Sequence, residues 1–289
     1  MRQTISFILN HPLTKHQKAR TLARFFKWQL RALFTKKPYK HRFTDKTVLI
    51  VEKGMTGATG NLYCGLHDYM EMFFLLHFLR PGDLFGDIGA NVGSYSILGA
   101  GHAKADVVAV EPSPSTFAKL TRNIEANGLT NCKAFNVALG DKKGEISFTN
   151  SRTDTLNRAA TKEDTDLITV PMDTLDNILQ GRPATILKVD VEGYEEHVLM
   201  GAKSTLANPA LKAIMIEIGG ASEHYGFNDG TIISTLRENG FESVLYDPAE
   251  RRLYRDRPED HKRMFVRDFD YVQEKLKSAP KVNILNNKI

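Results

Sequence analysis

Two carboxylates stand at the ends of consecutive candidate strands in the first half of the sequence. Asp87 lies near the end of the apolar run "DLFGDIG", and Glu111 follows the next apolar run in "DVVAVEP". In an open parallel sheet, ligands bind beyond the carboxyl ends of the strands, where the strand order reverses. An acid at the end of the second strand can accept hydrogen bonds from both ribose hydroxyls of a nucleoside. We therefore expect a nucleoside site at this edge.

The turn after the first strand, "FGDIGANVGSYS", differs from the dinucleotide pattern G-x-G-x-x-G. Its form is D-x-G-x-N-x-G, in which Gly89 and Gly93 allow tight turning while Asp87 would repel a diphosphate. A cationic ligand suits the turn better. S-adenosylmethionine, an adenosine without phosphates and with a charged amino-acid tail, meets both requirements and is the predicted cofactor. The alternative is a purely structural turn beside two surface acids.

A second group of chemically competent residues follows the candidate strand "ATILKVDV". Asp190 and Glu192 lie at its end, and Glu217 lies near the end of the next run, "LKAIMIEI". An alcohol acceptor needs a base or a metal ion beside it, and these acids are candidates for the base. They could alternatively bind a divalent cation through oxygen, but their spacing does not require one, and we predict no metal.

Lys188 stands inside the same strand, where a buried ammonium needs a partner. We expect an ion pair with Asp190, Asp87 or Glu217. Alternatively, Lys188 orients Asp190 or lowers the pKa of a substrate hydroxyl. His224, in the loop after the following strand, is either a general base or a surface histidine. Lys188 and His224 complete the predicted catalytic set of Asp190, Glu192 and Glu217.

Alternating strands and helices position these residues. We expect strands at 47–51, 83–89, 106–112, 132–139, 184–191, 211–218, 241–247 and 263–269, and helices at 68–79, 93–103, 113–129, 193–206 and 229–240. Strands separated by helices of this length are typical of a doubly wound, mostly parallel α/β sheet. Residues 144–172 indicate a short β excursion, and the segment between the strand at 47–51 and Gly65 a glycine-rich loop. Glu195 and Glu196 fall in the first turn of the helix at 193–206, where negative charge is favourable.

Five blocks of the sequence resemble the FkbM family of S-adenosylmethionine-dependent methyltransferases. They are "FGDIGANVGSYSI", "VVAVEPSPSTFAKLTRNIEANGL", "NVALGDKKGEISF", "VPMDTLDNIL" and "ILKVDVEGYEEHVLMGA", within a resemblance that runs from about residue 60 to about residue 250. The resemblance implies a seven-stranded class I methyltransferase fold. It also implies O-methylation of a hydroxyl on a sugar or a natural product.

Carried over residue by residue, the resemblance gives a set of cofactor-binding positions. The predicted set is Asp87, Gly89, Asn91, Gly93, Glu111, Pro112, Ala138 and Leu139. The first four would hold the methionine part, Glu111 the ribose, and the segment 137–141 would border the adenine. An RNA 2′-O-methyltransferase is the alternative, because the Asp-Lys-Glu set is similar to the arrangement in such enzymes. The net acidic body and the lack of an aromatic and basic platform argue against it, so we expect no nucleic-acid partner.

The basic charge of the chain is concentrated at its N-terminus. Residues 1–42 hold eleven of the 39 Lys and Arg residues and none of the 34 Asp and Glu residues, which leaves a net charge of −6 for the rest. Within 15–37, Leu22, Phe26, Leu30 and Leu33 recur at helical spacing. We predict a basic amphipathic extension over 1–45 and a methyltransferase domain over 46–289. The helix would contact a membrane surface, form a lid on the catalytic domain, or do both.

No run of about 18 apolar residues and no signal-peptide pattern occurs in the sequence. Cys64 and Cys132 are far apart and in no metal-like spacing, which favours two unpaired thiols in a reducing compartment. We expect a cytoplasmic protein, at the inner face of the membrane if residues 15–37 bind lipid. The expected partner is a small-molecule or glycan acceptor, and the alternative is a membrane-surface-associated methyltransferase that acts on a lipid-linked glycan. The sequence predicts no oligomeric state.

Overall fold

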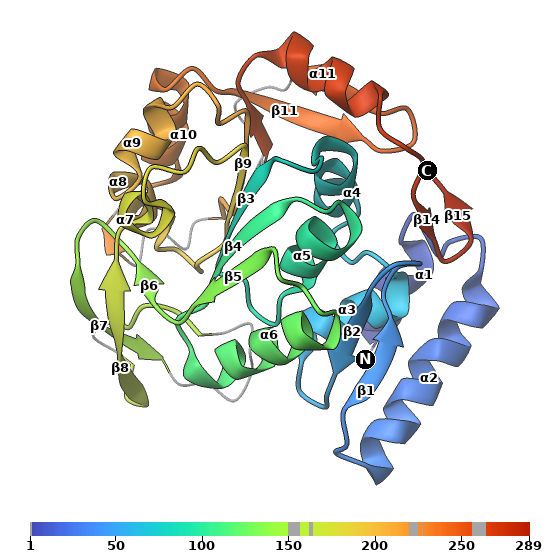
Figure 1. Cartoon of the computed structure of the whole chain (residues 1–289). Helices are drawn as coiled ribbons and strands as arrows, with labels where there is room; N and C mark the ends of the chain where they lie inside the picture. Colours follow the sequence, from blue (N-terminus) through green and yellow to red (C-terminus); the bar gives the residue numbers. More distant parts are fainter. Residues whose placement is uncertain (1, 150–156, 162–163, 220–224, 227, 256–263) are drawn as a thin grey trace.

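A central sheet of eight strands organises the computed structural model, which describes residues 2–149, 157–161, 164–219, 225–226, 228–255 and 264–289 (Figure 1). The strand order is β12-β11-β13-β10-β9-β3-β4-β5. The strands are β3 (Leu84–Ile88), β4 (Asp106–Val110), β5 (Cys132–Phe135), β9 (Ile186–Val189), β10 (Ala213–Ile216), β11 (Glu242–Asp247), β12 (Arg252–Arg255) and β13 (Met264–Val266). Neighbours from β5 to β10 are parallel, whereas β13 is antiparallel to both β10 and β11. The doubly wound, mostly parallel α/β fold is confirmed.

The sheet differs from the expectation at two places. The seven-stranded sheet that the family resemblance implies has an additional strand here, β12, which pairs antiparallel with β11. The prediction of a single strand over 132–139 is wrong. Only its first half, β5, belongs to the central sheet, and its second half forms the separate strand β6 (Ala138–Leu139). β6 joins β7 (Gly144–Thr149) and β8 (Leu167–Asp173) in a separate three-stranded sheet, which contains the expected β excursion.

The register of the central strands aligns their carboxyl ends. Ile88 pairs with Val110 of β4 and with Val189 of β9, and Val189 pairs with Ile216 of β10. The residues that follow these ends therefore emerge at one edge of the sheet. The strand order reverses between β3 and β9, since the chain runs from β3 towards β5 on one side and from β9 towards β10 on the other. This is the place where doubly wound sheets bind ligands.

Helices cover both faces of the sheet (Figure 1). They are α4 (Tyr69–Phe78), α5 (Ser94–Ile97), a π-helical turn (Leu98–His102), α6 (Pro114–Ala126), α7 (Leu175–Leu179), α8 (Glu195–Met200), α9 (Lys203–Ala207), α10 (Asp229–Glu238) and α11 (Phe269–Lys277). Side chains of the strands alternate between the two layers: Val107 packs in the core with α4 and α5, and Val108 in the core with α7 to α10.

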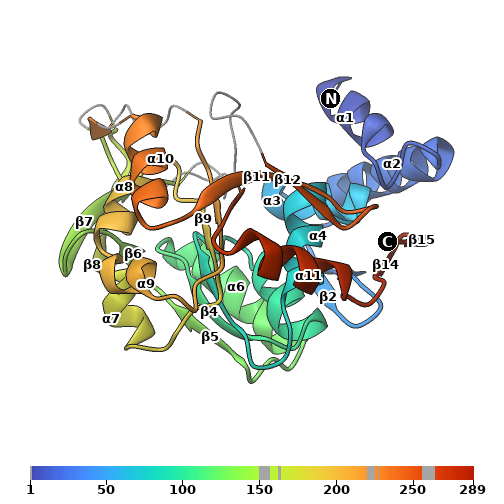
Figure 2. The same cartoon turned by 90° about the horizontal axis from the view of Figure 1, so that it is seen from above.

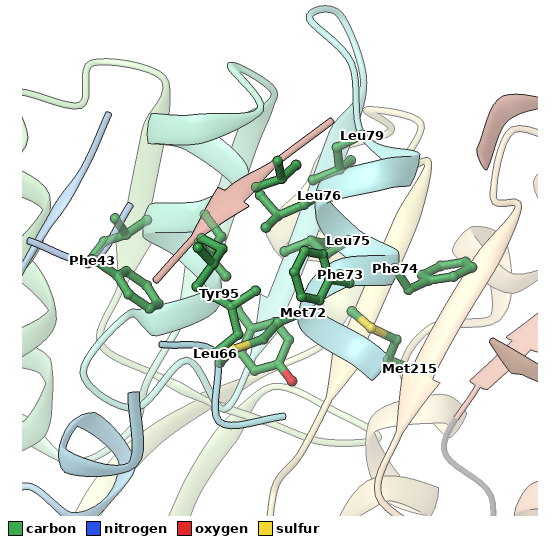
Figure 3. Packing of buried hydrophobic residues seen from close by; sticks show 14 of the residues in the cluster. Phe43, Leu66, Met72, Phe73, Phe74, Leu75, Leu76, Leu79, Tyr95 and Met215 are labelled. Carbon is green, nitrogen blue, oxygen red and sulfur yellow. The ribbon is translucent and has the colours of Figure 1, made fainter. Parts of the chain in front are cut away.

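α4 is the most enclosed of the longer helices. All seven residues from Met72 to Phe78 are buried, and Figure 3 shows several of them packed with Phe43, Leu66, Tyr95 and Met215. A helix that is apolar on every side is stable only when its surroundings cover it completely. Because α4 has this support, its N-terminal end can hold Asp68 and Met72 rigidly at the edge of the sheet.

The N-terminal segment packs on the domain that contains the central sheet. It contains α1 (Arg2–Asn10), α2 (Lys18–Phe34), the antiparallel pair β1 (Tyr39–Arg42) and β2 (Val48–Val51), and α3 (Thr56–Cys64). Ile8, Leu13, Phe25 and Trp28 are buried in the same core as α4. The C-terminal hairpin of β14 (Asn283–Ile284) and β15 (Asn287–Lys288) also touches this segment, through hydrogen bonds to Gln17 and Leu13. The domain boundary at residue 45 stays a prediction.

The helix predicted at 15–37 is confirmed as α2, but the glycine-rich loop predicted after β2 is wrong, because it is largely the helix α3. Burial of Ala58, Leu62 and Tyr63 on this helix outweighs the low helix propensity of its glycines. None of the helices in the described part of the chain is long and apolar enough to cross a bilayer.

Candidate active site

A cavity of about 400 Å³ opens at the carboxyl edge of the sheet, where the strand order reverses. This volume is within the range of small-molecule sites. Eight of the predicted residues line it: Gly89, Asn91, Glu111, Pro112, Lys188, Asp190, Glu192 and Glu217. The opposite wall comes from Gly57, His67, Asp68 and Met72, on α3, α4 and their connection. The parallel sheet therefore brings together residues that are up to about 130 positions apart in the sequence.

The turns after β3 and β9 form the floor of this cavity. Asn91 and Glu192 adopt left-handed backbone conformations, with φ of 51° and 57°, which are uncommon for residues other than glycine. The turns also touch each other: a Cβ atom on Gly89, where φ is +76°, would lie 1.8 Å from the carbonyl oxygen of Asp190. Gly89 is thus required both by its dihedral angle and by the approach of the neighbouring turn. Gly93 does not line the cavity and packs against Leu120 of α6.

Glu111 is fixed by hydrogen bonds to both of its carboxylate oxygens. Oε2 accepts from the backbone N–H of Asn91 at 3.0 Å, and Oε1 accepts from that of Ser113 at 2.9 Å. A carboxylate offers about four lone-pair positions, so it can accept hydrogen bonds from several donors at once. Glu111 is buried and lines the cavity. Its geometry fits a ligand with two adjacent hydroxyls, such as a ribose.

An apolar recess of about 20 Å³ adjoins the cavity beyond Glu111. It contains the predicted Ala138 and Leu139, and its walls also include Val137, Ile146 and Tyr194. The recess shares Gly89, Pro112, Phe148 and Val191 with the main cavity. An apolar surface next to the Glu111 carboxylate fits the edge of an adenine ring. The site thus offers surfaces for both parts of an adenosine.

Lys188 lies at the base of the other half of the cavity. Its Nζ donates to Asp190 Oδ2 at 2.7 Å and lies 4.9 Å from the centroid of the Tyr95 ring. Burial works against the ammonium, but Asp190 and Asp87 more than offset it and raise the pKa of Lys188. The expected ion pair with Asp190 is therefore present, and Lys188 stays charged.

Asp87 lies beneath the site rather than in its wall. It is fully buried and is absent from the described lining residues, although Lys188 stands beside it in the register of β3 and β9. Ser96 Oγ donates to Oδ2 at 2.5 Å, and Oδ1 has no hydrogen-bond partner within the described ranges. Burial raises the pKa of Asp87, against the opposing effects of Lys188 and Ser96. The geometry favours a role in supporting Lys188 over direct contact with a methionine.

Three carboxylates converge above Lys188. One oxygen each from Asp190, Glu192 and Glu217 lies within 4.8 Å of the other two. Such a set can take up the proton of a hydroxyl, or hold a hard divalent cation through oxygen ligands. The adjacent ammonium already compensates one of the negative charges, which favours the first use.

Comparison with known proteins identifies the family. The family described as Methyltransferase FkbM domain matches residues 87–243, which is more than half of the chain. The chain belongs to the FkbM methyltransferase family. The family prediction from the sequence blocks is therefore confirmed.

Two curated proteins are similar to this FkbM-family chain in sequence. Hexuronic acid methyltransferase AglP of Haloferax volcanii is 29% identical over 166 residues, which cover 57% of this chain and 65% of AglP. The 31-O-demethyl-FK506 methyltransferase FkbM of Streptomyces tacrolimicus is 26% identical, and the match covers 57% of this chain and 75% of that protein. The match to AglP thus spans less than two thirds of that protein. Among solved structures, TYW2 of M. jannaschii in complex with AdoMet is similar at 15% identity and a TM-score of 0.41, over 80% of this chain and 84% of that one.

The FkbM match leaves out one wall of the cavity. It begins at Asp87, so α3, α4 and their connection lie before it. Asp68 of this wall accepts a hydrogen bond from the Tyr95 hydroxyl at 3.0 Å, and both residues line the cavity. Asp68, Tyr95 and His67 are not among the residues predicted from the sequence. Their spacing in the sequence does not reveal them, because they lie near Lys188 only through the packing of α4 and α5 on the sheet.

Glu195 and His224 are two further positions that the sequence singled out. Glu195 lies in the first turn of α8 as expected, but it is buried and accepts from the backbone N–H groups of Val191 at 2.9 Å and Gly193 at 3.3 Å. Burial raises the pKa of Glu195 to about 7 despite these hydrogen bonds. Its carboxyl thus supports the turn that carries Glu192. The predicted His224 lies outside the described residues.

Proposed function

We propose that this protein transfers a methyl group from S-adenosylmethionine to a hydroxyl of a sugar or a secondary metabolite. The observation that carries the proposal is the convergence of Asp190, Glu192 and Glu217 within 4.8 Å, at the edge of the sheet that also presents Glu111. The name of one relative, a 31-O-demethyl-FK506 methyltransferase, supports O-methylation, and the name of the other, a hexuronic acid methyltransferase, supports a sugar as the class of acceptor.

The cavity fits the proposed cofactor. S-adenosylmethionine, when bound, supplies an electrophilic methyl group on a positively charged sulfur. Glu111 would accept hydrogen bonds from the ribose hydroxyls, and the turn with Gly89 and Asn91 would hold the amino-acid part. The apolar recess with Ala138 and Leu139 would contact the adenine. The acidic lining favours a ligand whose reactive atom is cationic.

The three converging carboxylates would act on the acceptor. A hydroxyl has a pKa well above 7, so it must donate its proton to a base as its oxygen is methylated. Asp190, Glu192 and Glu217 place acceptor oxygens where such a hydroxyl would lie. Lys188 holds Asp190 in one orientation through the 2.7 Å ion pair. We therefore assign orientation of the hydroxyl to Asp190 and removal of its proton to the three acids as a set.

The charge of the cavity favours a neutral acceptor. Lys188 is the only lysine or arginine among the described lining residues, which include the acids Asp68, Glu111, Asp190, Glu192 and Glu217. A carboxylate on the acceptor would lie close to several like charges in a partly desolvated site, and such contacts are unfavourable. A neutral polyhydroxylated compound would instead offer hydroxyl donors to the same oxygens.

The test is a methylation assay with the full chain. The acceptor panel contains neutral glycosides, the matching uronic acids, macrolide alcohols and a ribo-oligonucleotide, and mass spectrometry detects S-adenosylhomocysteine together with the methylated product. We expect O-methylation, with neutral glycosides preferred to uronic acids by at least tenfold. Methylation only at nitrogen or carbon, or only of the oligonucleotide, would contradict the proposal.

A parallel assay with EDTA separates the two uses of the acid set. Because we predict no metal, turnover should be retained. Turnover that is lost in EDTA and restored by Mg²⁺ would assign the three carboxylates to a cation instead.

A further inference from the structure

Helix α2 has two apolar faces, and only one of them packs on the protein. Thr21, Phe25 and Trp28 are buried against the catalytic domain. Phe26, Leu30, Leu33 and Phe34 recur at helical spacing and are exposed by 55%, 58%, 74% and 82%. Figures 1 and 2 both show α2 at the periphery of the molecule, away from the central sheet. The exposed residues therefore form a surface stripe, which we call the α2 stripe.

The α2 stripe is unusual within this molecule. No other large hydrophobic residue in the described part of the chain is more than 45% exposed. Isolated exposed apolar side chains are common, but a contiguous apolar surface marks a binding site for a partner or a membrane. The stripe thus points to an occupant that covers it.

The charges around the stripe select that occupant. Lys18, Arg20, Lys27, Lys36 and Lys37 are exposed on α2 or just after it, and residues 1–42 contain no acid. A second copy of the chain would bring the same positive charge to the interface, and like charges disfavour such pairing. An anionic lipid surface matches both the apolar stripe and the basic flanks. We propose that α2 docks this protein on an anionic phospholipid bilayer, with the α2 stripe buried at the level of the headgroups.

The docking helix is connected to the wall of the cavity. Gln29 donates to the Tyr63 hydroxyl of α3 at 3.0 Å, and the rings of Phe25 and Tyr63 lie 5.1 Å apart. In the turn between α1 and α2, His11 Nε2 lies 3.1 Å from the carbonyl oxygen of His67, which lines the cavity. Docking through α2 would therefore place the active-site wall near the bilayer. An acceptor carried on a lipid fits this position, a consequence that rests on the proposed function, whereas the lipid binding does not.

The test is vesicle flotation with the full chain. Vesicles contain phosphatidylcholine alone or phosphatidylcholine mixed with phosphatidylglycerol. Deletion of α2 is not suitable, because Phe25 and Trp28 belong to the core. The stripe variant carries Phe26→Gln, Leu30→Gln, Leu33→Gln and Phe34→Gln, and its matched control carries Met200→Gln and Leu245→Gln, which are exposed on other elements. A charge variant carries Lys27→Gln, Lys36→Gln and Lys37→Gln.

We expect the wild type and the control to float with the anionic vesicles and not with the neutral ones. The stripe variant should bind at least tenfold more weakly with an unchanged Tm, and the charge variant should also bind more weakly. Wild-type protein that does not float, or that floats as well as the stripe variant, would overturn the proposal. A dimer seen by light scattering, which the stripe variant abolishes while no form binds vesicles, would overturn it in favour of a second copy.

Discussion

The two halves of the cavity use acidic residues in opposite ways. In the half formed by β3 and β4, both carboxylate oxygens of Glu111 accept hydrogen bonds from backbone N–H groups. In the half formed by β9 and β10, Asp190, Glu192 and Glu217 converge around one buried ammonium. A carboxylate fixed by neutral donors is suited to binding, whereas several acids in one place suit proton transfer. From this difference we predict that cofactor affinity and methyl transfer depend on separate sets of residues.

We expect the largest loss of turnover from a substitution in the half formed by β9 and β10. Asp190→Asn removes the charged partner of Lys188 and an acceptor for the substrate hydroxyl. We expect turnover to fall by roughly 10²- to 10⁴-fold, the usual contribution of acid–base groups, at saturating cofactor. Steady-state kinetics with the acceptor identified by the methylation assay measures it. The control is Glu145→Gln, an exposed acid on β7, which should leave turnover unchanged. Equal turnover of Asp190→Asn and the control would remove Asp190 from the chemistry.

The contact between the two halves depends on Gly89. In Gly89→Ala the new Cβ would collide with the carbonyl oxygen of Asp190, in addition to the cost of the positive φ. We expect a loss of roughly 4 kcal/mol in the free energy of unfolding, from about 1 to 2 kcal/mol for the dihedral and the rest for overpacking. Gly181→Ala is the matched control, because its φ is +77° and no atom lies within 4 Å of the new Cβ. Urea unfolding should show the larger loss for Gly89→Ala; equal losses would mean that the turns do not constrain each other.

Glu195 is buried beneath the turn that carries Glu192, and the cost of ionising it there should make the free energy of unfolding depend on pH. Its pKa is raised from 4.5 to about 7, so its protonated form stabilises the folded state. That stabilisation is complete below about pH 4.5 and is lost as the pH rises to about 7. Relative to Glu195→Gln, the free energy of unfolding of the wild type should therefore fall by on the order of 3 kcal/mol across this interval. Urea titrations at a series of pH values measure the difference, and a difference that stays constant with pH would exclude an elevated pKa.

We expect a smaller change in free energy, a loss of cofactor affinity, from a substitution in the half formed by β3 and β4. Glu111→Gln replaces one acceptor oxygen by an amide that faces backbone N–H groups. We expect S-adenosylmethionine to bind at least tenfold more weakly, about 1.4 kcal/mol or more, as measured by calorimetry. Glu125→Gln, an exposed acid on α6, is the control and should bind the cofactor like the wild type. A variant at Glu111 with unchanged affinity would show that this acid does not hold the ribose.

The sequence predicted the residues whose position follows from the parallel sheet alone. Glu111, Asp190 and Glu217 come directly after strands, and the register of parallel strands places such residues at one edge. Asp87 faces the same side of the sheet as its register partner Lys188, but it lies inside β3 rather than after it, and its short side chain is fully buried beneath the cavity. Lys188 also precedes the end of its strand by one residue, but its longer side chain reaches the cavity, so a prediction of lining residues depends on side-chain length as well as on the strand end.

Contacts between elements could not be predicted in the same way. Asp68 and Tyr95 reach the site because α4 and α5 pack on the sheet. On α2, periodicity identified an apolar stripe, but Phe25 and Trp28 pack on the domain while Phe26 and Leu30 face outward. A helix with two apolar faces does not reveal from its sequence which of them the protein covers.

The cavity is divided, on this interpretation, into a half that binds the cofactor and a half that acts on the acceptor. The most direct test is a calorimetric titration of S-adenosylmethionine into Glu111→Gln and Asp190→Asn under identical conditions. We predict at least tenfold weaker binding for Glu111→Gln, and binding within about threefold of the wild type for Asp190→Asn. Equal losses in the two variants, or a larger loss for Asp190→Asn, would contradict the division.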